Sequence, residues 1–330
     1  MAVVGQDLTA PGIGRRCAVL GHPVAHSLSP ALHRAAYAGL GLAGWGYGLQ
    51  DVTEHQLPAV LAQLDATWGG LSLTMPLKQV VIPLLDVVDP LAEVTGAVNT
   101  LVVQPGRAGR VGPLVGFNTD VHGIVATVRE TAPAGWRPRH AAILGARATA
   151  SSAVAALTEL GAARTTVVGR SFAGPGAAPA AAHRMGVATE NVLWSSADVA
   201  AAALEGADVV VSTVPAGAAD AVAAALTERL AGSASALAGT VLLDAVYDPW
   251  PSPLARAWRD AGGAVAPGWV MLLHQAQVQV KLMTGHEPDV EVMRAAVVAE
   301  LGRRAGGGEV PPSPAVFALP ADAAPRAPGT

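Results

Sequence analysis

The chain has 330 residues, of which 51% are hydrophobic and 14% are charged, with a formal net charge of −4 and a single cysteine. A charged fraction so far below the usual value of about 25% excludes an intrinsically disordered chain and a nucleic-acid-coating protein. The lone cysteine excludes a disulfide framework and a thiolate zinc site, and the length predicts about two domains.

The first third of the chain predicts alternating strands and helices. An apolar run over residues 17–21 indicates a buried strand, and the loop after it leads to a helix with Ser29 as its N-cap and Pro30 in its first turn, ending near Leu40. A second helix is expected over residues 54–66, and a second strand over residues 70–74. This alternation continues to about Val103 and is typical of an α/β domain.

The middle of the chain predicts a parallel sheet. Apolar and β-branched runs predict strands over residues 141–145, 165–170, 207–213 and 240–244, with a helix over residues 149–160. Strands without a polar face are typical of a sheet that helices cover on both sides. Residues 122–267 are therefore predicted to form one doubly wound, Rossmann-type domain. Residues 268–303 are expected to be helical, and residues 304–330, rich in Ala, Gly and Pro, to be a disordered tail.

A glycine at the end of the strand over residues 141–145 indicates a dinucleotide site. The helix that follows offers unpaired N–H groups and a positive dipole end to a pyrophosphate. Gly145 and Ala150 match the first and third positions of the G-x-G-x-x-G/A fingerprint, but Arg147 stands where a glycine normally lets the backbone approach the phosphates. An ordinary strand-to-helix turn is the alternative interpretation.

Arg170 bears on the choice of cofactor. At the end of the second strand of such a domain, an acidic residue binds the ribose 2′-hydroxyl of NAD, whereas an arginine accommodates the 2′-phosphate of NADP. Arg170 ends the strand over residues 165–170, and no Asp or Glu lies between Arg164 and Thr189. The sequence therefore favours NADP, with a solvated surface arginine as the alternative.

Polar residues at loop positions indicate proton chemistry. Lys78 follows the strand over residues 70–74, Asn99 ends an apolar stretch, and Asp120 follows Gly116 and Phe117. A lysine that faces a carboxylate can move a proton beside a hydride transfer, because each group shifts the pKa of the other. Only two of the 21 basic residues are lysines, which lowers the chance background for Lys78. A surface ion pair is the alternative.

Six ordered motifs resemble the shikimate dehydrogenase family. They are HSLSPALH (26–33), LTMPLK (73–78), GAVNT (96–100), GFNTD (116–120), DAVYDP (244–249) and GWVMLLHQA (268–276), the last followed by LMTG (282–285). The resemblance implies a substrate-binding catalytic α/β domain over residues 1–121, completed by helices over residues 268–303. It also implies an NADP domain over residues 122–267 and an active site in the cleft between the two domains.

The resemblance also implies the roles of individual residues. Lys78 and Asp120 correspond to the catalytic pair at the reacting oxygen, and Ser27 and Ser29 to hydroxyls that hold the substrate carboxylate. Gln279, one helical turn after Gln275, is either near the same face or an ordinary helix-surface residue. Thr74, Asn99 and Gln275 correspond to donors to the ring hydroxyls of the substrate. Tyr247 corresponds to a tyrosine that lines the site from the cofactor side.

The cofactor site departs from the family pattern. Where the family usually has Gly-x-Gly-Gly, Arg147 either contacts a phosphate or crowds it, and the asparagine that usually precedes Arg170 is a glycine. The expected cofactor-binding residues are Gly145, Ala146, Arg147, Ala148, Arg170, Thr213, Val246 and Gly268.

The implied activity is the reversible, NADPH-dependent reduction of 3-dehydroshikimate to shikimate in chorismate and aromatic amino acid biosynthesis, without a metal. Two alternatives stay open: an NAD-using quinate/shikimate dehydrogenase, and a non-catalytic shikimate-binding sensor of the same fold. The expected partner is a small-molecule substrate, not nucleic acid or a membrane, and the expected state is a monomer or homodimer. The chain has no apolar run of about 18 residues and no signal-peptide pattern, so the cytoplasm is the expected compartment.

Overall fold

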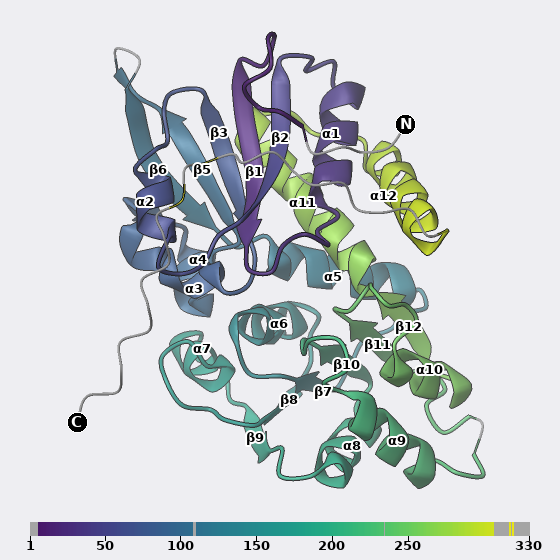
Figure 1. The fold of residues 1–330 in the computed structure, drawn as a ribbon. Helices are drawn as coiled ribbons and strands as arrows, with labels where there is room; N and C mark the ends of the chain where they lie inside the picture. Colours follow the sequence, from purple (N-terminus) through teal and green to yellow (C-terminus); the bar gives the residue numbers. More distant parts are fainter. Residues whose placement is uncertain (1–5, 108–109, 234, 307–316, 318, 320–330) are drawn as a thin grey trace. The chain divides into compact units, whose positions relative to one another are not determined.

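Figure 1 shows the computed structural model, which describes residues 6–107, 110–233, 235–306, 317 and 319. The chain divides into two compact units. The first unit comprises Met1–Asp89, Val98–Phe117 and Gln279–Thr330, and the second comprises Pro90–Ala97 and Asn118–Val278. Residues 90–97, 118–121 and 268–278 therefore group with the second unit. The functional division into domains stays a prediction.

The first unit is built on a six-stranded mixed sheet in the order β2-β1-β3-β5-β6-β4. Strand β1 is parallel to β2 and β3, whereas β5 is antiparallel to β3 and β6. Therefore the carboxyl ends of β1, β3 and β6 and the start of β5 share one edge of the sheet. The strands are β1 (Arg15–Gly21), β2 (Trp45–Asp51), β3 (Trp68–Leu73), β4 (Val87–Val88), β5 (Thr100–Pro105) and β6 (Val111–Phe117).

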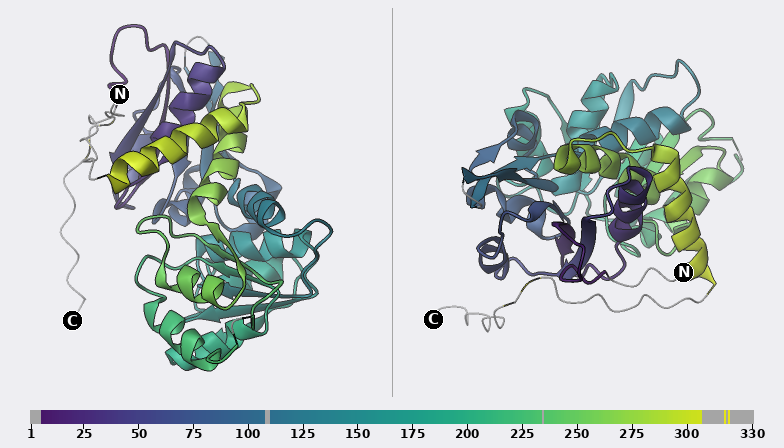
Figure 2. Two further views of the ribbon diagram at one scale, coloured as in Figure 1. Left: turned by 90° about the vertical axis from the view of Figure 1, so that its right-hand side faces the viewer. Right: turned by 90° about the horizontal axis from the view of Figure 1, so that it is seen from above.

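Two helices of the first unit, α1 (Ser29–Gly39) and α12 (Val290–Ala305), contact one another and lie side by side in Figures 1 and 2. Helix α11 (Gly268–Thr284) begins in the second unit, and its residues from Gln279 onward belong to the first. The short helical elements are α2 (Leu57–Leu61), α3 (Leu77–Val80) and the 3-10 turn η1 (Ile82–Leu84).

Two local predictions for this unit are wrong. Ser29 is the first residue of α1 rather than its N-cap, and the N-cap residue, Leu28, makes no side-chain capping bond; Pro30 does lie in the first turn. The helix expected over residues 54–66 is limited to Leu57–Leu61. The carboxylate of Asp65 instead accepts a hydrogen bond from the backbone N–H of Thr67 at 2.9 Å, and this local turn competes with continuation of the helix.

The second unit contains an all-parallel sheet in the order β12-β11-β10-β7-β8-β9. Its strands are β7 (His140–Leu144), β8 (Arg164–Gly169), β9 (Glu190–Leu193), β10 (Val209–Ser212), β11 (Val241–Asp244) and β12 (Ala264–Pro267). Its helices, besides the first part of α11, are α4 (Pro90–Thr95), α5 (Asp120–Thr131), α6 (Ala148–Glu159), α7 (Ala178–Arg184), α8 (Ala197–Glu205), α9 (Asp220–Arg229) and α10 (Pro253–Asp260).

Two buried apolar clusters in this unit explain why its strands lack a polar face. Ile143 and Val211 belong to one cluster, whereas Leu144 and Val210, their neighbours along the same strands, belong to the other. Successive side chains of a strand point to opposite faces, so both faces of the sheet are covered. The predicted α/β fold class, with a doubly wound parallel sheet, is confirmed.

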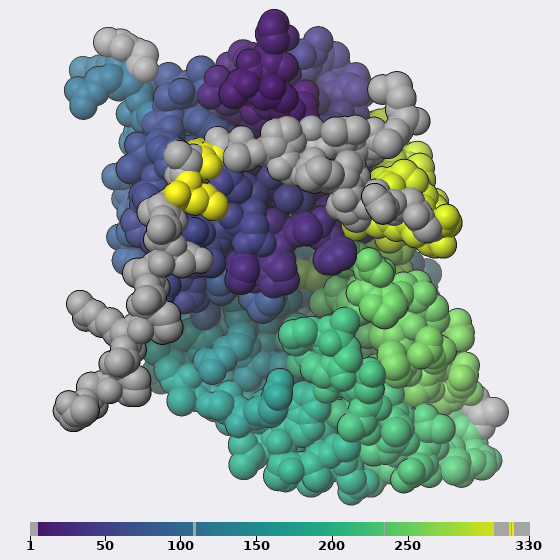
Figure 3. Space-filling model, viewed as in Figure 1, coloured from purple at the N-terminus to yellow at the C-terminus, as the bar shows by residue number. Residues whose placement is uncertain are grey.

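The predicted tail, residues 304–330, lies mostly outside the described residues. Arg304 and Ala305 complete α12, and Phe317 is buried, with its ring stacked on Trp68 at 4.7 Å between centroids. Gln50 donates a hydrogen bond to the Phe317 carbonyl at 2.8 Å. Figure 3 shows the space-filling surface of the described residues, with the start of the first unit in purple and the end of α12 in yellow. In the described part of the chain, no helix combines the length and apolar character needed to cross a membrane.

Candidate functional site

Five residues predicted to act on the substrate lie beside one edge of the first sheet. Ser27 and Ser29 follow β1, Thr74 and Lys78 follow β3, and Asn99 immediately precedes β5. The strand directions bring these widely separated chain positions to the same edge. The first unit therefore gathers hydroxyl, ammonium and amide groups at one place.

The loop that carries Ser27 is held by the end of α12. Arg304 donates hydrogen bonds to the carbonyls of His26 and Ser27 at 2.7 and 3.3 Å, and its guanidinium also contacts Glu300 at 2.8 Å. The Ser27 hydroxyl accepts a hydrogen bond from the Ser29 N–H at 3.2 Å. Arg304, which the sequence pattern assigns to the tail, thus positions the Ser27 loop.

Thr74 and Lys78 lie in a tight connection after β3. The N–H of Thr74 donates to the Leu20 carbonyl at 2.9 Å, and the N–H of Leu77 donates to the Thr74 carbonyl at 2.8 Å. A Cβ on Gly21 would lie 2.3 Å from Cγ2 of Thr74, so only glycine permits this close approach of β1 to the Thr74 loop. Both Thr74 and Lys78 are half-buried.

Asn99 is only 2% exposed and is tied to both neighbouring strands. Its carbonyl accepts from the N–H of Leu73 at 2.8 Å, and its N–H donates to the Phe117 carbonyl at 3.1 Å. Its side-chain Oδ1 accepts from the hydroxyl of Thr100 at 2.8 Å. The backbone of Asn99 is therefore fixed by the sheet, and its amide by a neighbouring hydroxyl.

The second unit brings Asp120 and Gln275 into one neighbourhood. Asp120, 3% exposed, begins α5, where the helix dipole favours a negative charge. Gln275 of α11 accepts a hydrogen bond from Thr119 at 3.3 Å. A Cβ on Gly123 would lie 3.0 Å from Cβ of Gln275, so this glycine allows α5 and α11 to pack closely.

Asn118 positions Asp120 within the second unit. Its Oδ1 accepts from the Asp120 N–H at 3.0 Å, and its Nδ2 donates to Thr95 of α4 at 2.8 Å and to Ser152 of α6 at 2.9 Å. The sequence shows Asn118 only as part of a motif. Its positioning role could not be predicted, because its partners Thr95 and Ser152 are 23 and 34 residues away. Lys78 and Asp120 belong to different units, and their pairing stays a prediction.

The predicted cofactor residues lie beside the carboxyl edge of the second sheet. Gly145 follows β7 and Thr213 follows β10, the two neighbouring strands at which the strand order reverses. Dinucleotides bind at such a switch point in doubly wound folds. Gly145 has φ +114°, and a Cβ there would lie 2.2 Å from the Thr213 hydroxyl oxygen, so glycine is required on both counts.

The residues around α6 fit an anionic dinucleotide. Arg147 is the N-cap residue of α6, without a side-chain capping bond, so the first N–H groups of the helix face the edge as hydrogen-bond donors. Ala146 is buried and Ala148 is the first helical residue. The exposed side chain of Arg147 donates to the Ala173 carbonyl at 3.3 Å, so it reaches the loop after β8. That loop begins with Arg170, whose guanidinium lies 5.6 Å from the ring centroid of Trp194.

The last cofactor residues pack backbone against backbone. The N–H of Gly268 donates to the Val246 carbonyl at 3.3 Å, and a Cβ on Gly268 would lie 2.1 Å from the Ala245 carbonyl oxygen. Tyr247, the residue after Val246, is half-buried. Burial raises the pKa of Asp244 beneath this loop, while its hydrogen bond from Ser252 at 2.6 Å opposes that shift.

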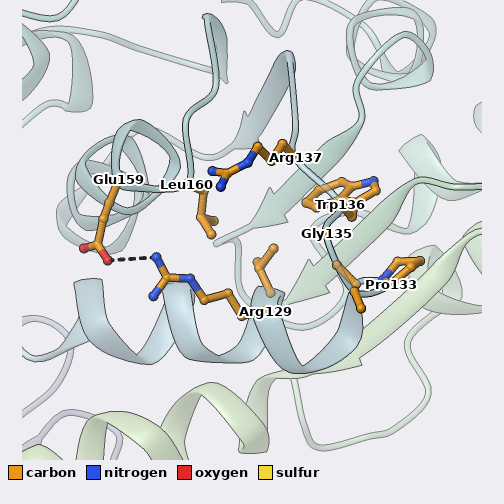
Figure 4. A pocket seen from close by; sticks show the side chains of 10 residues that line it. Arg129, Pro133, Gly135, Trp136, Arg137, Glu159 and Leu160 are labelled. Carbon is orange, nitrogen blue, oxygen red and sulfur yellow. Dashed lines mark hydrogen bonds and ion pairs between the residues drawn. The ribbon is translucent and has the colours of Figure 1, made fainter.

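A separate cavity of about 280 Å³ lies in the second unit, at the end of α5 (Figure 4). Arg129 pairs with Glu159 at 3.4 Å on its rim, and Trp136 and Arg137 line it. None of the predicted site residues lines this cavity. Among the described residues, no group of three or more His, Cys, Asp and Glu side chains is arranged to hold a metal ion.

Comparison with known proteins gives two family matches. Residues 19–101 match the shikimate dehydrogenase substrate binding domain, and residues 268–298 match the shikimate 5′-dehydrogenase C-terminal domain. A shikimate dehydrogenase (NADP(+)) from Rubrobacter xylanophilus is 35% identical over 286 residues, which cover 86% of this chain and 95% of that protein.

Solved structures agree with these matches. The shikimate dehydrogenase of Mycobacterium tuberculosis is similar with a TM-score of 0.68 at 40% identity, covering 87% of this chain and 99% of that chain. A shikimate 5-dehydrogenase from Thermus thermophilus, in complex with NADP(H) and shikimate, is similar with a TM-score of 0.68 at 32% identity, covering 86% of this chain and 99% of that chain.

Proposed function

The chain belongs to the shikimate dehydrogenase family, and we propose that it catalyses the reversible, NADPH-dependent reduction of 3-dehydroshikimate to shikimate. The observation that carries this proposal is that the family's motif residues fall at the polar edges of the two sheets, where β1, β3 and β5 meet and where β7 and β10 meet. Relatives that match most of the chain are named as NADP(+) enzymes, which favours neither the NAD-using quinate alternative nor the non-catalytic sensor.

In this reaction a hydride adds to the carbonyl carbon and a proton adds to the carbonyl oxygen. NADPH supplies the hydride when it is bound. Lys78 donates the proton from its ammonium group to the forming alkoxide and is reprotonated from solvent. Asp120 is assigned to assist Lys78 in this proton transfer, because a carboxylate near an ammonium stabilises its charged form. The half-buried position of Lys78 and the burial of Asp120 support these roles.

The substrate is held by hydroxyl and amide groups. Ser27 and Ser29 bind its carboxylate, and the loop they occupy is fixed by Arg304. Thr74, Asn99 and Gln275 donate hydrogen bonds to the ring hydroxyls of the substrate. Tyr247 lines the site on the side of the cofactor. Such donors reject analogues that lack a hydroxyl, because a buried polar group left unpaired is costly.

NADP is held along the carboxyl edge of the second sheet. Its pyrophosphate would lie at the N-terminus of α6, beside Gly145, Ala146, Arg147 and Ala148. Arg170 would pair with the 2′-phosphate, and its stacking on Trp194 supports that role by limiting its freedom. Thr213, Val246 and Gly268 would complete the edge of the site. We further propose that the protein is a cytoplasmic monomer or homodimer. Burial raises the pKa of the Cys17 thiol to about 11, which keeps the thiol protonated.

The first test is shikimate oxidation, followed at the absorbance band of reduced nicotinamide with NADP and NAD in parallel. We expect clear turnover with NADP preferred, and a Lys78→Ala variant that binds shikimate but loses about 10²- to 10⁴-fold in kcat. Lys281→Ala is the matched control, because Lys281 is exposed and pairs with Glu287 at 2.6 Å. Equal turnover with NAD contradicts the NADP assignment, and unchanged turnover in Lys78→Ala contradicts the proton role.

A further inference from the structure

A chain of buried hydrogen bonds in the first unit ends at Asn99. It joins six side chains that are all no more than 3% exposed: His33, Tyr47, Ser72, Gln279, Thr100 and Asn99. We propose that Gln279 and Thr100 are positioning residues, which fix the orientation of the Asn99 side-chain amide so that Asn99 acts toward the substrate as a hydrogen-bond donor. This inference rests on the proposed function, which assigns Asn99 to the substrate.

The orientation of the Gln279 amide follows from a backbone carbonyl. One end of this amide lies 3.1 Å from the carbonyl oxygen of Asn99, which can only accept a hydrogen bond. That end must therefore be the nitrogen, Nε2, since an oxygen there would face a second acceptor. The other proton of Nε2 points to the hydroxyl of Thr100 at 2.9 Å. Both protons of the Gln279 amide are thus used within the chain.

The opposite end of Gln279 must then accept, and two buried donors meet it. The hydroxyl of Ser72 donates to Oε1 at 2.8 Å, and is itself the acceptor for the Tyr47 phenol at 2.6 Å. Nε2 of His33 lies 3.2 Å from the same oxygen. Burial raises the pKa of Tyr47 well above its ordinary value, so the phenol keeps the proton that it donates.

His33 contributes as a neutral donor. Burial lowers the pKa of its imidazole to about 3, so the ring carries one proton near neutral pH, and the contact with Gln279 requires that proton on Nε2. Nδ1 is then an acceptor, and it has no hydrogen-bond partner among the described residues. The ring also stacks on Tyr47 at 4.0 Å between centroids.

Thr100 passes this order on to Asn99. Its hydroxyl oxygen accepts from Gln279, so its single proton is available for another acceptor, and Oδ1 of Asn99 lies 2.8 Å away. Oδ1 of Asn99 is therefore the end of the amide that faces Thr100, and Nδ2 is the other end. A substrate hydroxyl that meets Asn99 at Nδ2 accepts a hydrogen bond, which makes Asn99 a donor of defined direction.

Removing the Thr100 hydroxyl breaks this order in a measurable way. Thr100→Val preserves the side-chain shape. It leaves one proton of Gln279 and Oδ1 of Asn99 without a hydrogen-bond partner, so the Asn99 side-chain amide can rotate by 180°. We expect KM for shikimate to rise about tenfold while kcat changes less than about threefold, because a single oriented hydrogen bond is lost from binding. Thr100→Ser keeps the hydroxyl and should restore KM.

The experiment measures KM, kcat and, by calorimetry without turnover, the Kd for shikimate. It uses wild type, Thr100→Val, Thr100→Ser, Asn99→Ala and the double variant Thr100→Val/Asn99→Ala. Thr127→Val is the matched control, since Thr127 is fully buried and loses one hydrogen bond, to the Gly123 carbonyl at 2.7 Å, outside this chain of contacts. We expect Thr100→Val to weaken binding in wild type and to add nothing in the Asn99→Ala background.

The outcomes separate this inference from the proposed function. A folded Thr100→Val variant with wild-type KM and Kd overturns the inference. The inference is also overturned if Thr100→Val weakens shikimate binding as much in the Asn99→Ala background as in the wild type. Asn99→Ala with wild-type binding overturns the proposed role of Asn99 instead. Wild type that binds shikimate but never oxidises it overturns the proposed activity, while the Kd values still decide on Thr100.

Gln279→Glu gives a second test that does not depend on the stability of Thr100→Val. An ionised carboxylate can donate neither to the Asn99 carbonyl nor to Thr100, whereas a protonated one supplies one of the two protons and restores part of the order. Burial raises the pKa of a carboxyl group, so KM of this variant should fall as the pH is lowered from about 9 to about 6 relative to wild type. Gln277→Glu, two residues away on α11, is the control. A KM ratio that does not change with pH contradicts the inference.

Discussion

Gly268→Ala is the substitution whose effect the structure defines most sharply. The new Cβ would lie 2.1, 2.4 and 2.9 Å from the oxygen, carbon and Cα of Ala245. Non-bonded heavy atoms rest at about 3.5 Å, so the backbone after β11 and the start of α11 must separate by at least about 1 Å. All three obstructing atoms are backbone, and therefore no side chain can simply rotate away.

Overpacking of this kind typically costs about 1–3 kcal/mol of unfolding free energy, and we expect the upper end of that range here. The shift in the melting temperature should be about 5–10 °C. The separation also displaces Val246, whose carbonyl accepts the Gly268 N–H at 3.3 Å. Because a displacement of about 1 Å can cost about 10²-fold in rate, kcat/KM for NADP should fall by roughly that factor.

The assay combines thermal melting with NADP-dependent shikimate oxidation. Gly206→Ala is the matched control, because Gly206 has a φ of −92° and a Cβ there would meet nothing within 4 Å. If Gly268→Ala has the same melting temperature and kcat/KM as the control, then α11 does not approach the Ala245 carbonyl as closely as the structure indicates.

Three further predictions concern single side chains. Arg170→Ala should raise KM for NADP about tenfold or more and leave KM for NAD unchanged, with exposed Arg164→Ala as the control; equal losses for both cofactors would contradict a 2′-phosphate contact. For His33, the ordinary pKa of 6.5 applies in the unfolded chain and about 3 in the folded one, so the unfolded chain binds more protons between these values and stability falls as the pH falls. Between about pH 7 and about pH 5, the unfolding free energy measured in urea should fall by about 2 kcal/mol because of His33. The His33→Gln variant should not show this part of the pH dependence. Phe317→Ala should lower the unfolding free energy by about 1–3 kcal/mol, because its buried ring stacks on an indole, whereas Leu319→Ala, at 38% exposure, should change it by less than about 0.5 kcal/mol; equal effects would mean that the ring is not anchored.

Four strands of the second sheet (β7, β8, β10 and β11) could be predicted within one or two residues, whereas the sequence analysis missed β9 and β12. Continuous apolar runs bounded by glycine or polar residues, as in β7 and β8, leave few alternatives, because a strand buried on both faces has no polar position. The helix expected over residues 54–66 was too long, since α2 spans only Leu57–Leu61 and the chain forms a local turn at Asp65. Short helices depend on such local hydrogen bonds more than on periodicity.

The sequence by itself determined the family, the α/β fold class and the residues that stand at the ends of strands, since motifs and apolar runs are properties of neighbouring residues. Only the tertiary structure decided which side chains hold those residues in place. Arg304 reaches the Ser27 loop across 277 residues, and Gln279 reaches Thr100 across 179. Hydrogen bonds at such separations depend on how strands and helices pack, and no local pattern encodes them, so the orientation of Asn99 emerges only once the first sheet and α11 are assembled.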